Sequence, residues 1–232
     1  GRRSFHSTER GLEALASAGA KVAVHVVDLD SGSVVLAGDD HVSLPVAGLG
    51  VIPLLIEVAA GIEDGSLDEF ELIDRSADEQ APASGVWRNL RTPTMPLGDL
   101  AVLAATGGDP IAANLLLDRV GHERVSARIG SLSLPRTALM DRFRDRRGPD
   151  DAPHPAVGTA RELARLLAGL VNAQVVSAAV SAQVAEWLSL NHDLSLVAAA
   201  TGLDPFTHDD DAHGLLFINK TGRAAGIRAE AG

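Results

Sequence analysis

Histidine, serine and carboxylate side chains with chemical potential lie in several separate parts of the chain. Residues 208–213 read HDDDAH, a composition typical of metal sites. We expect a solvated loop there, with no helical spacing to aim these side chains inward, so the sequence does not predict a metal site. His192 and Asp193 are the residue types of a general base and its orienting carboxylate, but adjacent side chains point in different directions in most conformations. Cysteine is absent, which excludes a cysteine nucleophile and thiolate metal ligands.

Basic residues are few, and lysine is almost missing. The chain of 232 residues has 20 basic and 31 acidic residues and a net charge of −11, and its only lysines are Lys21 and Lys220. A strongly acidic molecule repels polyanions, so we expect no nucleic-acid partner and no anionic membrane surface. The arginine-rich run over residues 136–147 is interpreted as a solvated loop, with binding of an anion or a partner as the alternative.

The hydrophobic pattern predicts the elements that must position these groups. A buried helix over residues 51–60 is the expected centre of the molecule, because it is apolar on all sides. The other predicted elements are a helix over 7–18, a hairpin from 22–27 and 34–36, two helices within 97–120 separated at 106–110, an irregular loop over 136–157, helices over 159–170 and 177–188, and a strand over 215–218 whose hairpin partner is 226–231.

Strands at both ends with helices between them predict an α+β fold in which the terminal strands share one antiparallel sheet. We expect a single domain over residues 1–232, with an α/β part from about 1–45 and 177–232 and a helical part from about 46–176. A cleft between the two parts is the expected place for a ligand. No apolar stretch is long enough to span a membrane, and the N-terminal residues show no apolar run of signal-peptide length, which favours a cytoplasmic location.

The motifs and their order resemble the class A β-lactamase and penicillin-binding serine hydrolase family over nearly the whole chain. In that family a hairpin is followed by S-x-x-K on the buried helix, S-D-N, an Ω-loop glutamate and a K-T-G strand. Lys220-Thr221-Gly222 is intact, and the segments that match around the other motifs are residues 44–47, 52–55, 84–86 and 111–117. The resemblance implies the serine β-lactamase and transpeptidase fold, without a cofactor.

The catalytic motifs depart from the family pattern. The nucleophile position falls on Gly48, the lysine position on Val51 and the glutamate position on Arg144, while the second motif keeps only Asp109. Acyl transfer needs a hydroxyl nucleophile and a base that activates it, and glycine and valine supply neither. The sequence therefore predicts a homologue that does not acylate.

The resemblance implies that Lys220 and Thr221 bind an anionic group, and that the Gly48 N–H keeps an oxyanion donor. The predicted ligand-binding residues are Gly48, Asp109, Lys220, Thr221, Gly222 and Ser84, with Lys220 as the catalytic candidate. Each also has a structural interpretation: Lys220 and Thr221 end a strand, Asp109 forms a turn, the glycines allow close packing, and Ser84 has no identified base beside it.

Two functions remain open. The first is a binding or regulatory protein that holds a small anionic or carbonyl ligand in the family's cleft. The second is a hydrolase of altered chemistry, acting on β-lactam-like, ester or amide substrates with Lys220 and a relocated nucleophile. The family's C-terminal strand and helix do not appear within this sequence. Either the sequence is shortened or, if it is whole, we expect a homodimer that covers the exposed edge or a lower stability.

Overall fold

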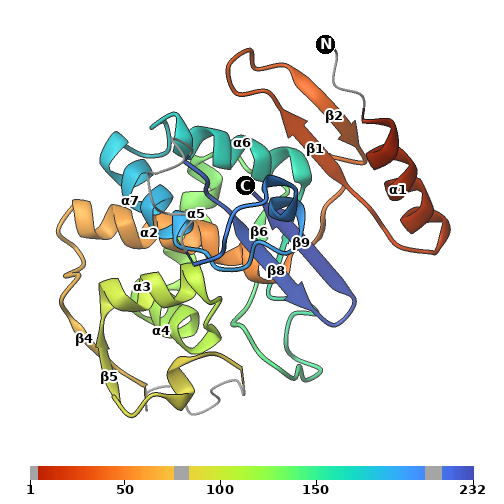
Figure 1. Cartoon of the computed structure of the whole chain (residues 1–232). Helices are drawn as coiled ribbons and strands as arrows, with labels where there is room; N and C mark the ends of the chain where they lie inside the picture. Colours follow the sequence, from red (N-terminus) through yellow and green to blue (C-terminus); the bar gives the residue numbers. More distant parts are fainter. Residues whose placement is uncertain (1–4, 76–83, 207–215) are drawn as a thin grey trace.

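The first elements of the chain form a helix and a hairpin at one side of the molecule (Figure 1). The structure is a computed structural model, and it describes residues 5–75, 84–206 and 216–232. Helix α1 (His6–Ser17) precedes strands β1 (Val24–Val27) and β2 (Val34–Gly38), which pair antiparallel. In the turn, Asp28 accepts hydrogen bonds from the backbone N–H and hydroxyl of Ser31. The predicted helix and hairpin are confirmed.

The predicted central helix is also confirmed. A short 3-10 helix, η1 (Ala47–Gly50), leads into α2 (Val51–Glu63), in which residues 51–61 are all buried. Figure 1 shows α2 crossing the middle of the helical part, and α3, α4, α5 and α7 contact it. Its buried Glu57 accepts hydrogen bonds from Arg124 (2.9 Å) and Arg128 (2.7 Å) of α5. A buried carboxylate is tolerated here because two guanidinium groups compensate it.

The surrounding helices begin where the sequence places good caps. Thr159 and Ser177 accept hydrogen bonds from backbone N–H groups of the first turns of α6 and α7, as N-cap residues do. The five helices that pack around α2 or against each other are α3 (Leu97–Thr106), α4 (Pro110–Val120), α5 (His122–Ser131), α6 (Ala160–Val171) and α7 (Ala178–Ser189).

The remaining strands form small antiparallel sheets. One has the order β3-β7-β6, one pairs β4 with β5, and one pairs β8 with β9. Their bounds are β3 (Leu44–Pro45), β4 (Leu72–Asp74), β5 (Thr94–Pro96), β6 (Ala138–Leu139), β7 (Ala156–Gly158), β8 (Lys220–Ala224) and β9 (Ile227–Ala231), and two short 3-10 helices are η3 (Trp87–Asn89) and η4 (Val197–Thr201). The mixed helix and sheet composition confirms the predicted α+β class.

Two details of the prediction need correction. Within the described residues, the terminal strands do not share one sheet: β1–β2 and β8–β9 are separate hairpins, and each packs against α6 instead of pairing with the other. The strand predicted over 215–218 is also displaced. Residues 216–219 are not in a strand, and β8 begins at Lys220, because Lys220 pairs with Ala231 and the partner strand ends there. Residue 215 lies outside the described residues.

In the part of the chain that the structure describes, no helix is long and apolar enough to cross a membrane.

Candidate ligand site at the start of strand β8

Lys220 lies at the first position of β8 and is almost completely buried, with 2% of its surface exposed. Among the described residues, its Nζ makes one long hydrogen bond, to the Thr221 carbonyl oxygen at 3.5 Å. Burial lowers the pKa of Lys220 to about 8, and the nearby carboxylate of Asp193 opposes that shift. The Lys220 ammonium is buried and makes few hydrogen bonds, so it has N–H donors that an anionic ligand is able to use.

Gly108, which belongs to the second motif, lies next to the Lys220 amine. A Cβ built on Gly108 would lie 3.5 Å from Lys220 Nζ, and Gly108 has a positive φ of 59°. The fold therefore brings the predicted second motif and the K-T-G strand together at one point, although the two are more than a hundred residues apart. Because Gly108 has no side chain, the Lys220 amine faces the backbone at this point.

The backbones of η1 and β8 pack against each other at Gly48, the position where the family has its nucleophile. A Cβ on Gly48 would lie 2.9 Å from the Thr221 carbonyl oxygen, and a Cβ on Gly222 would lie 2.1 Å from the Val46 carbonyl oxygen. Ala47, just before Gly48, is buried and has a positive φ of 48°, a strained conformation for a residue with a side chain. The contact leaves no room for a side chain at position 48 unless the backbone moves.

Asp109 is buried and holds local structure together. Its Oδ1 accepts hydrogen bonds from the N–H groups of Ile111 (3.0 Å) and Ala112 (3.1 Å), which makes it the N-cap of α4, and its Oδ2 accepts from the Trp87 N–H (2.8 Å). Gly85, with φ of 101°, packs so closely that a Cβ there would lie 2.7 Å from Oδ2. Both carboxylate oxygens thus serve the backbone, which agrees with the structural interpretation of this residue.

Asp193 and Arg223 form an ion pair beside Lys220 and Thr221. The Arg223 guanidinium donates from Nε to Asp193 Oδ2 (2.8 Å) and from Nη2 to Oδ1 (3.2 Å), and the Ser195 hydroxyl donates to Oδ1 (2.5 Å). Partial burial raises the pKa of the Asp193 carboxyl, but hydrogen bonds from Arg223, Ser195 and Thr221 outweigh it and hold the pKa well below its usual range. The cluster joins cationic groups to a carboxylate that is ionised at neutral pH.

A buried amide pair anchors the segment that carries Asp193. Asn191 Nδ2 donates to Asn219 Oδ1 at 2.8 Å, and Asn219 Nδ2 donates to the Asp193 carbonyl oxygen (3.1 Å) and to Glu230 Oε1 (2.7 Å). Both asparagines are almost completely buried. These bonds fix the backbone of Asp193 against the residue before Lys220, while the Asp193 side chain stays partly exposed.

The sequence did not identify Arg223, Ser195 or the anionic role of Asp193. Arg223 directly follows the K-T-G motif, and this position was a usable signal. The sequence disfavours a pairing of His192 with Asp193, and in the structure the His192 ring contacts Phe206, with ring centroids 5.9 Å apart. The HDDDAH run at 208–213 lies outside the described residues, and no group of three potential metal ligands occurs among those that are described.

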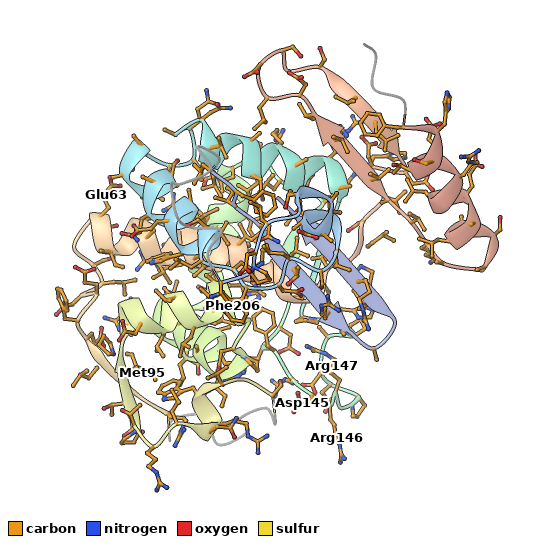
Figure 2. All side chains as sticks on the ribbon, viewed as in Figure 1. Glu63, Met95, Asp145, Arg146, Arg147 and Phe206 are labelled. Atoms are coloured by element: carbon orange, nitrogen blue, oxygen red, sulfur yellow. The ribbon has the colours of Figure 1, made fainter. Side chains whose placement is uncertain are left out.

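Ser84 is exposed and lies beside the loop that joins β6 to β7. Its hydroxyl donates to Asp145 Oδ1 at 3.4 Å. Figure 2 labels Asp145, Arg146 and Arg147 on this loop, below the β8–β9 hairpin. The loop is pinned by Asn114, whose amide bonds the Phe143 backbone N–H (2.8 Å) and carbonyl (3.0 Å). The structure therefore places Ser84 next to a carboxylate of the predicted Ω-loop region.

Arg144 and Val51, which occupy two catalytic positions of the family, make contacts that support the fold. Arg144, predicted at the glutamate position, forms ion pairs with Asp141 (3.4 Å) and Asp151 (3.5 Å) inside its own loop. Val51, predicted at the lysine position, is part of the hydrophobic core. Neither residue supplies a base.

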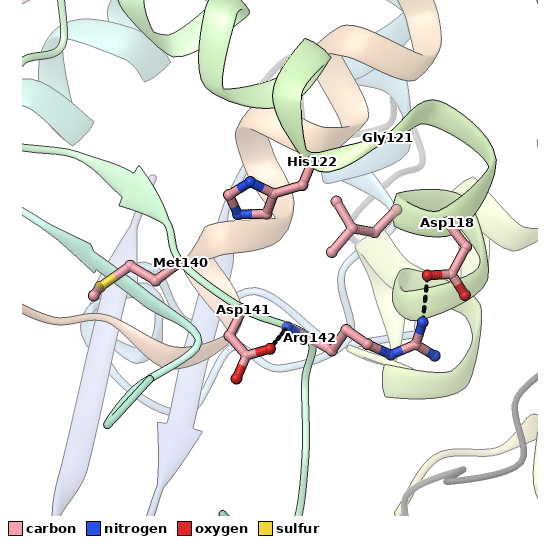
Figure 3. A pocket seen from close by; sticks show the side chains of 7 residues that line it. Asp118, Gly121, His122, Met140, Asp141 and Arg142 are labelled. Atoms are coloured by element: carbon pink, nitrogen blue, oxygen red, sulfur yellow. Dashed lines mark hydrogen bonds and ion pairs between the residues drawn. The ribbon is translucent and has the colours of Figure 1, made fainter. Parts of the chain in front are cut away.

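A separate open pocket of about 430 Å³ lies where α4, α5 and β6 meet (Figure 3). Arg142 lines it and is ion-paired with Asp118, as the close-up shows. The full lining is Leu117, Asp118, Gly121, His122, Met140, Asp141 and Arg142. This lining includes none of the predicted ligand-binding residues, so the pocket is distinct from the Lys220 site.

Comparisons with known proteins agree with this architecture. The model of the Beta-lactamase enzyme family matches residues 8–232, and the chain belongs to that family. A search of curated protein sequences returns no significant match.

Three solved structures share the fold. The β-lactamase from Sphaerobacter thermophilus DSM 20745 superposes with a TM-score of 0.82 at 23% identity, over 95% of this chain and 80% of that one. A mutant of the class A β-lactamase of the last common ancestor of Gram-negative bacteria gives 0.73 at 24% identity, over 96% and 81%. PBP-A gives 0.69 at 20% identity, over 86% and 70%. At these identities the similarity establishes the fold and no more.

Proposed function

We propose that this protein is a non-acylating member of its family that binds a small anionic ligand at Lys220, Thr221 and Arg223. One observation carries the proposal: the Gly48 backbone lies so close to the Thr221 carbonyl oxygen that a Cβ there would be only 2.9 Å away. A serine at position 48 would need a shift of backbone, which is costly in a packed interior. The site has lost both the hydroxyl and the space it needs.

The binding part of the proposal rests on the cations beside that contact. Burying the Lys220 ammonium is unfavourable without a compensating charge, and its neighbour Gly108 contributes no side chain. Arg223 adds a guanidinium that matches the geometry of a carboxylate. A small carboxylate or carbonyl compound fits these donors, and the oxyanion-type N–H of Gly48 lies along the same strand contact.

Mass spectrometry of the intact protein tests the loss of acylation. The protein is incubated separately with a penicillin, a cephalosporin and a fluorophosphonate, and we expect no adduct from folded protein. A stoichiometric adduct would overturn the proposal and support the relocated-nucleophile hydrolase. Peptide mapping would then show whether Ser84 is the modified residue.

Calorimetric titration with benzylpenicillin tests the binding part. We expect Lys220→Ala to abolish binding, because it removes the buried cation. Lys21→Ala is the matched control, since Lys21 is the only other lysine and is exposed. Equal binding by both variants would contradict the assignment of the site.

A further inference from the structure

We propose that the carboxylate of Asp193 occupies the anion site of Lys220, Thr221 and Arg223 as a built-in competitor, so that the ligand is a small carboxylate that must displace it. This inference rests on the proposed function and specifies the chemistry and regulation of that same site. It assigns Asp193 a role that the family motifs do not include.

The donors around Asp193 are the ones a ligand carboxylate would use. Arg223 approaches both oxygens, at 2.8 and 3.2 Å, which is the two-pronged geometry of guanidinium and carboxylate. Ser195 donates its hydroxyl (2.5 Å) and its backbone N–H (3.3 Å) to Oδ1. The Thr221 hydroxyl contributes to the lowered pKa of the same carboxylate, and the Lys220 ammonium attracts it. One intramolecular carboxylate thus takes both donors of the Arg223 guanidinium and lies in the field of the Lys220 ammonium.

The anchoring of Asp193 permits exchange of its side chain. Its backbone carbonyl is held by the Asn219 amide at 3.1 Å, so the main chain stays in place. Its side chain is 29% exposed and that of Arg223 is 43% exposed, so the ion pair borders solvent. Rotation of one side chain is sufficient to free the donors for an external anion, without any movement of β8.

A competitor inside the site weakens apparent affinity in proportion to its occupancy. If the donors are free for a tenth of the time or less, the apparent Kd is about tenfold or more above the intrinsic value. Replacing the carboxylate while leaving Lys220, Thr221 and Arg223 intact removes this competition. The same replacement leaves two cations without their carboxylate, which strengthens attraction for an external one.

The experiment compares benzylpenicillin with its methyl ester, which lacks the free carboxylate, by titration calorimetry. The proteins are the natural chain, Asp193→Asn, Asp193→Ser and the control Glu71→Gln. Glu71 pairs with Arg119 at similar exposure, on a different part of the molecule. We expect both Asp193 variants to bind the acid at least about tenfold more tightly, with no gain for the ester and no gain in the control. Adding Lys220→Ala to Asp193→Asn should remove the gain.

The outcomes separate this inference from the proposed function. If Asp193→Asn binds the acid no better than the natural chain, while Lys220→Ala still loses binding, the competitor is overturned and the anion site remains. If the ester gains as much as the acid, the competition is not for a carboxylate, and the inference fails. If neither the natural chain nor the folded variants bind the acid, both proposals are overturned. Thermal unfolding shows which variants are folded. Asp193→Asn and Asp193→Ser test the same prediction independently, so a folding failure of one leaves the other.

Discussion

Two sets of residues that alternate along the same short strand differ in what surrounds them. At Gly222 and the Thr221 carbonyl, β8 lies against η1 at a distance that excludes a side chain. At Arg223, a guanidinium meets the Asp193 carboxylate at the border of solvent, beside the buried ammonium of Lys220. The first region is uncharged, dense backbone and the second is a charged cluster that borders solvent. One short strand thus combines a contact that leaves no room for a side chain with a cluster of opposite charges.

The largest expected effect lies in the dense region. Gly222→Ala would place a Cβ 2.1 Å from the Val46 carbonyl oxygen, and neither backbone segment is able to move without disturbing its neighbours. We expect a loss of about 3 kcal/mol of unfolding free energy, or failure to fold. Gly130→Ala is the control, because a Cβ on this exposed glycine of α5 meets nothing within 4 Å. Urea denaturation measures both, and equal stability of the two variants would mean that the contact is not as close as described.

The next effect is in the charged cluster and depends on pH. Lys220 has a pKa of about 8 in the folded protein against 10.5 unfolded, so the unfolded chain holds the proton more strongly. Its burial costs stability fully below about pH 8, and the cost is relieved as pH rises from 8 to 10.5, where the unfolded chain also releases the proton. Lys220→Met should therefore stabilise by about 3 kcal/mol at pH 7.

Denaturation at pH 7 and pH 10.5 checks this sign. We expect the advantage of Lys220→Met over the natural chain to shrink markedly at the higher pH, and Lys21→Met to show no such trend. An advantage that is constant with pH would show that packing, and not the charge, explains it.

A third prediction contrasts the two carboxylates near the site. Asp109 serves three backbone N–H groups, so Asp109→Ala should destabilise by about 2 kcal/mol through the loss of a cap and of a buried tie to Trp87. Asp193→Asn also removes an ion pair and should destabilise, but by less than Asp109→Ala, because that pair borders solvent, and its main effect is expected on ligand affinity. Thermal unfolding of the two variants side by side distinguishes a structural carboxylate from an exchangeable one, and a reversed order of stability would contradict the distinction.

The smallest expected effect is on acylation, and it tests whether the dense region is closed. Gly48→Ser should cost about 2 kcal/mol of unfolding free energy, because the Cβ at 2.9 Å from the Thr221 carbonyl oxygen requires one of two packed backbone segments to shift. We expect no acylation by benzylpenicillin in this variant, as judged by intact mass, because Val51 provides no base. An acyl adduct in Gly48→Ser would show that the fold still accommodates the reaction.

Much of the fold was predictable from sequence because its signals are local. The run of apolar residues in α2, the caps at Thr159 and Ser177, and the turn after Asp28 depend on neighbours within a few positions. The start of β8 was not predictable in this way. It depends on pairing with Ala231, eleven residues further along, and residues 216–218 are apolar enough to be taken for a strand on their own.

The same distinction between local signals and long-range packing applies to the candidate site. The sequence by itself determined which groups exist: an intact Lys220-Thr221-Gly222, an aspartate able to cap a helix, and a glycine at the position of the family's nucleophile. Only the tertiary structure decided that Gly48 is closed against Thr221, that Gly108 faces Lys220, and that Asp193 reaches Arg223 across thirty residues. The physical reason is that residue type sets what a group is able to bind, whereas long-range packing sets whether its partner is a ligand, water or the chain itself.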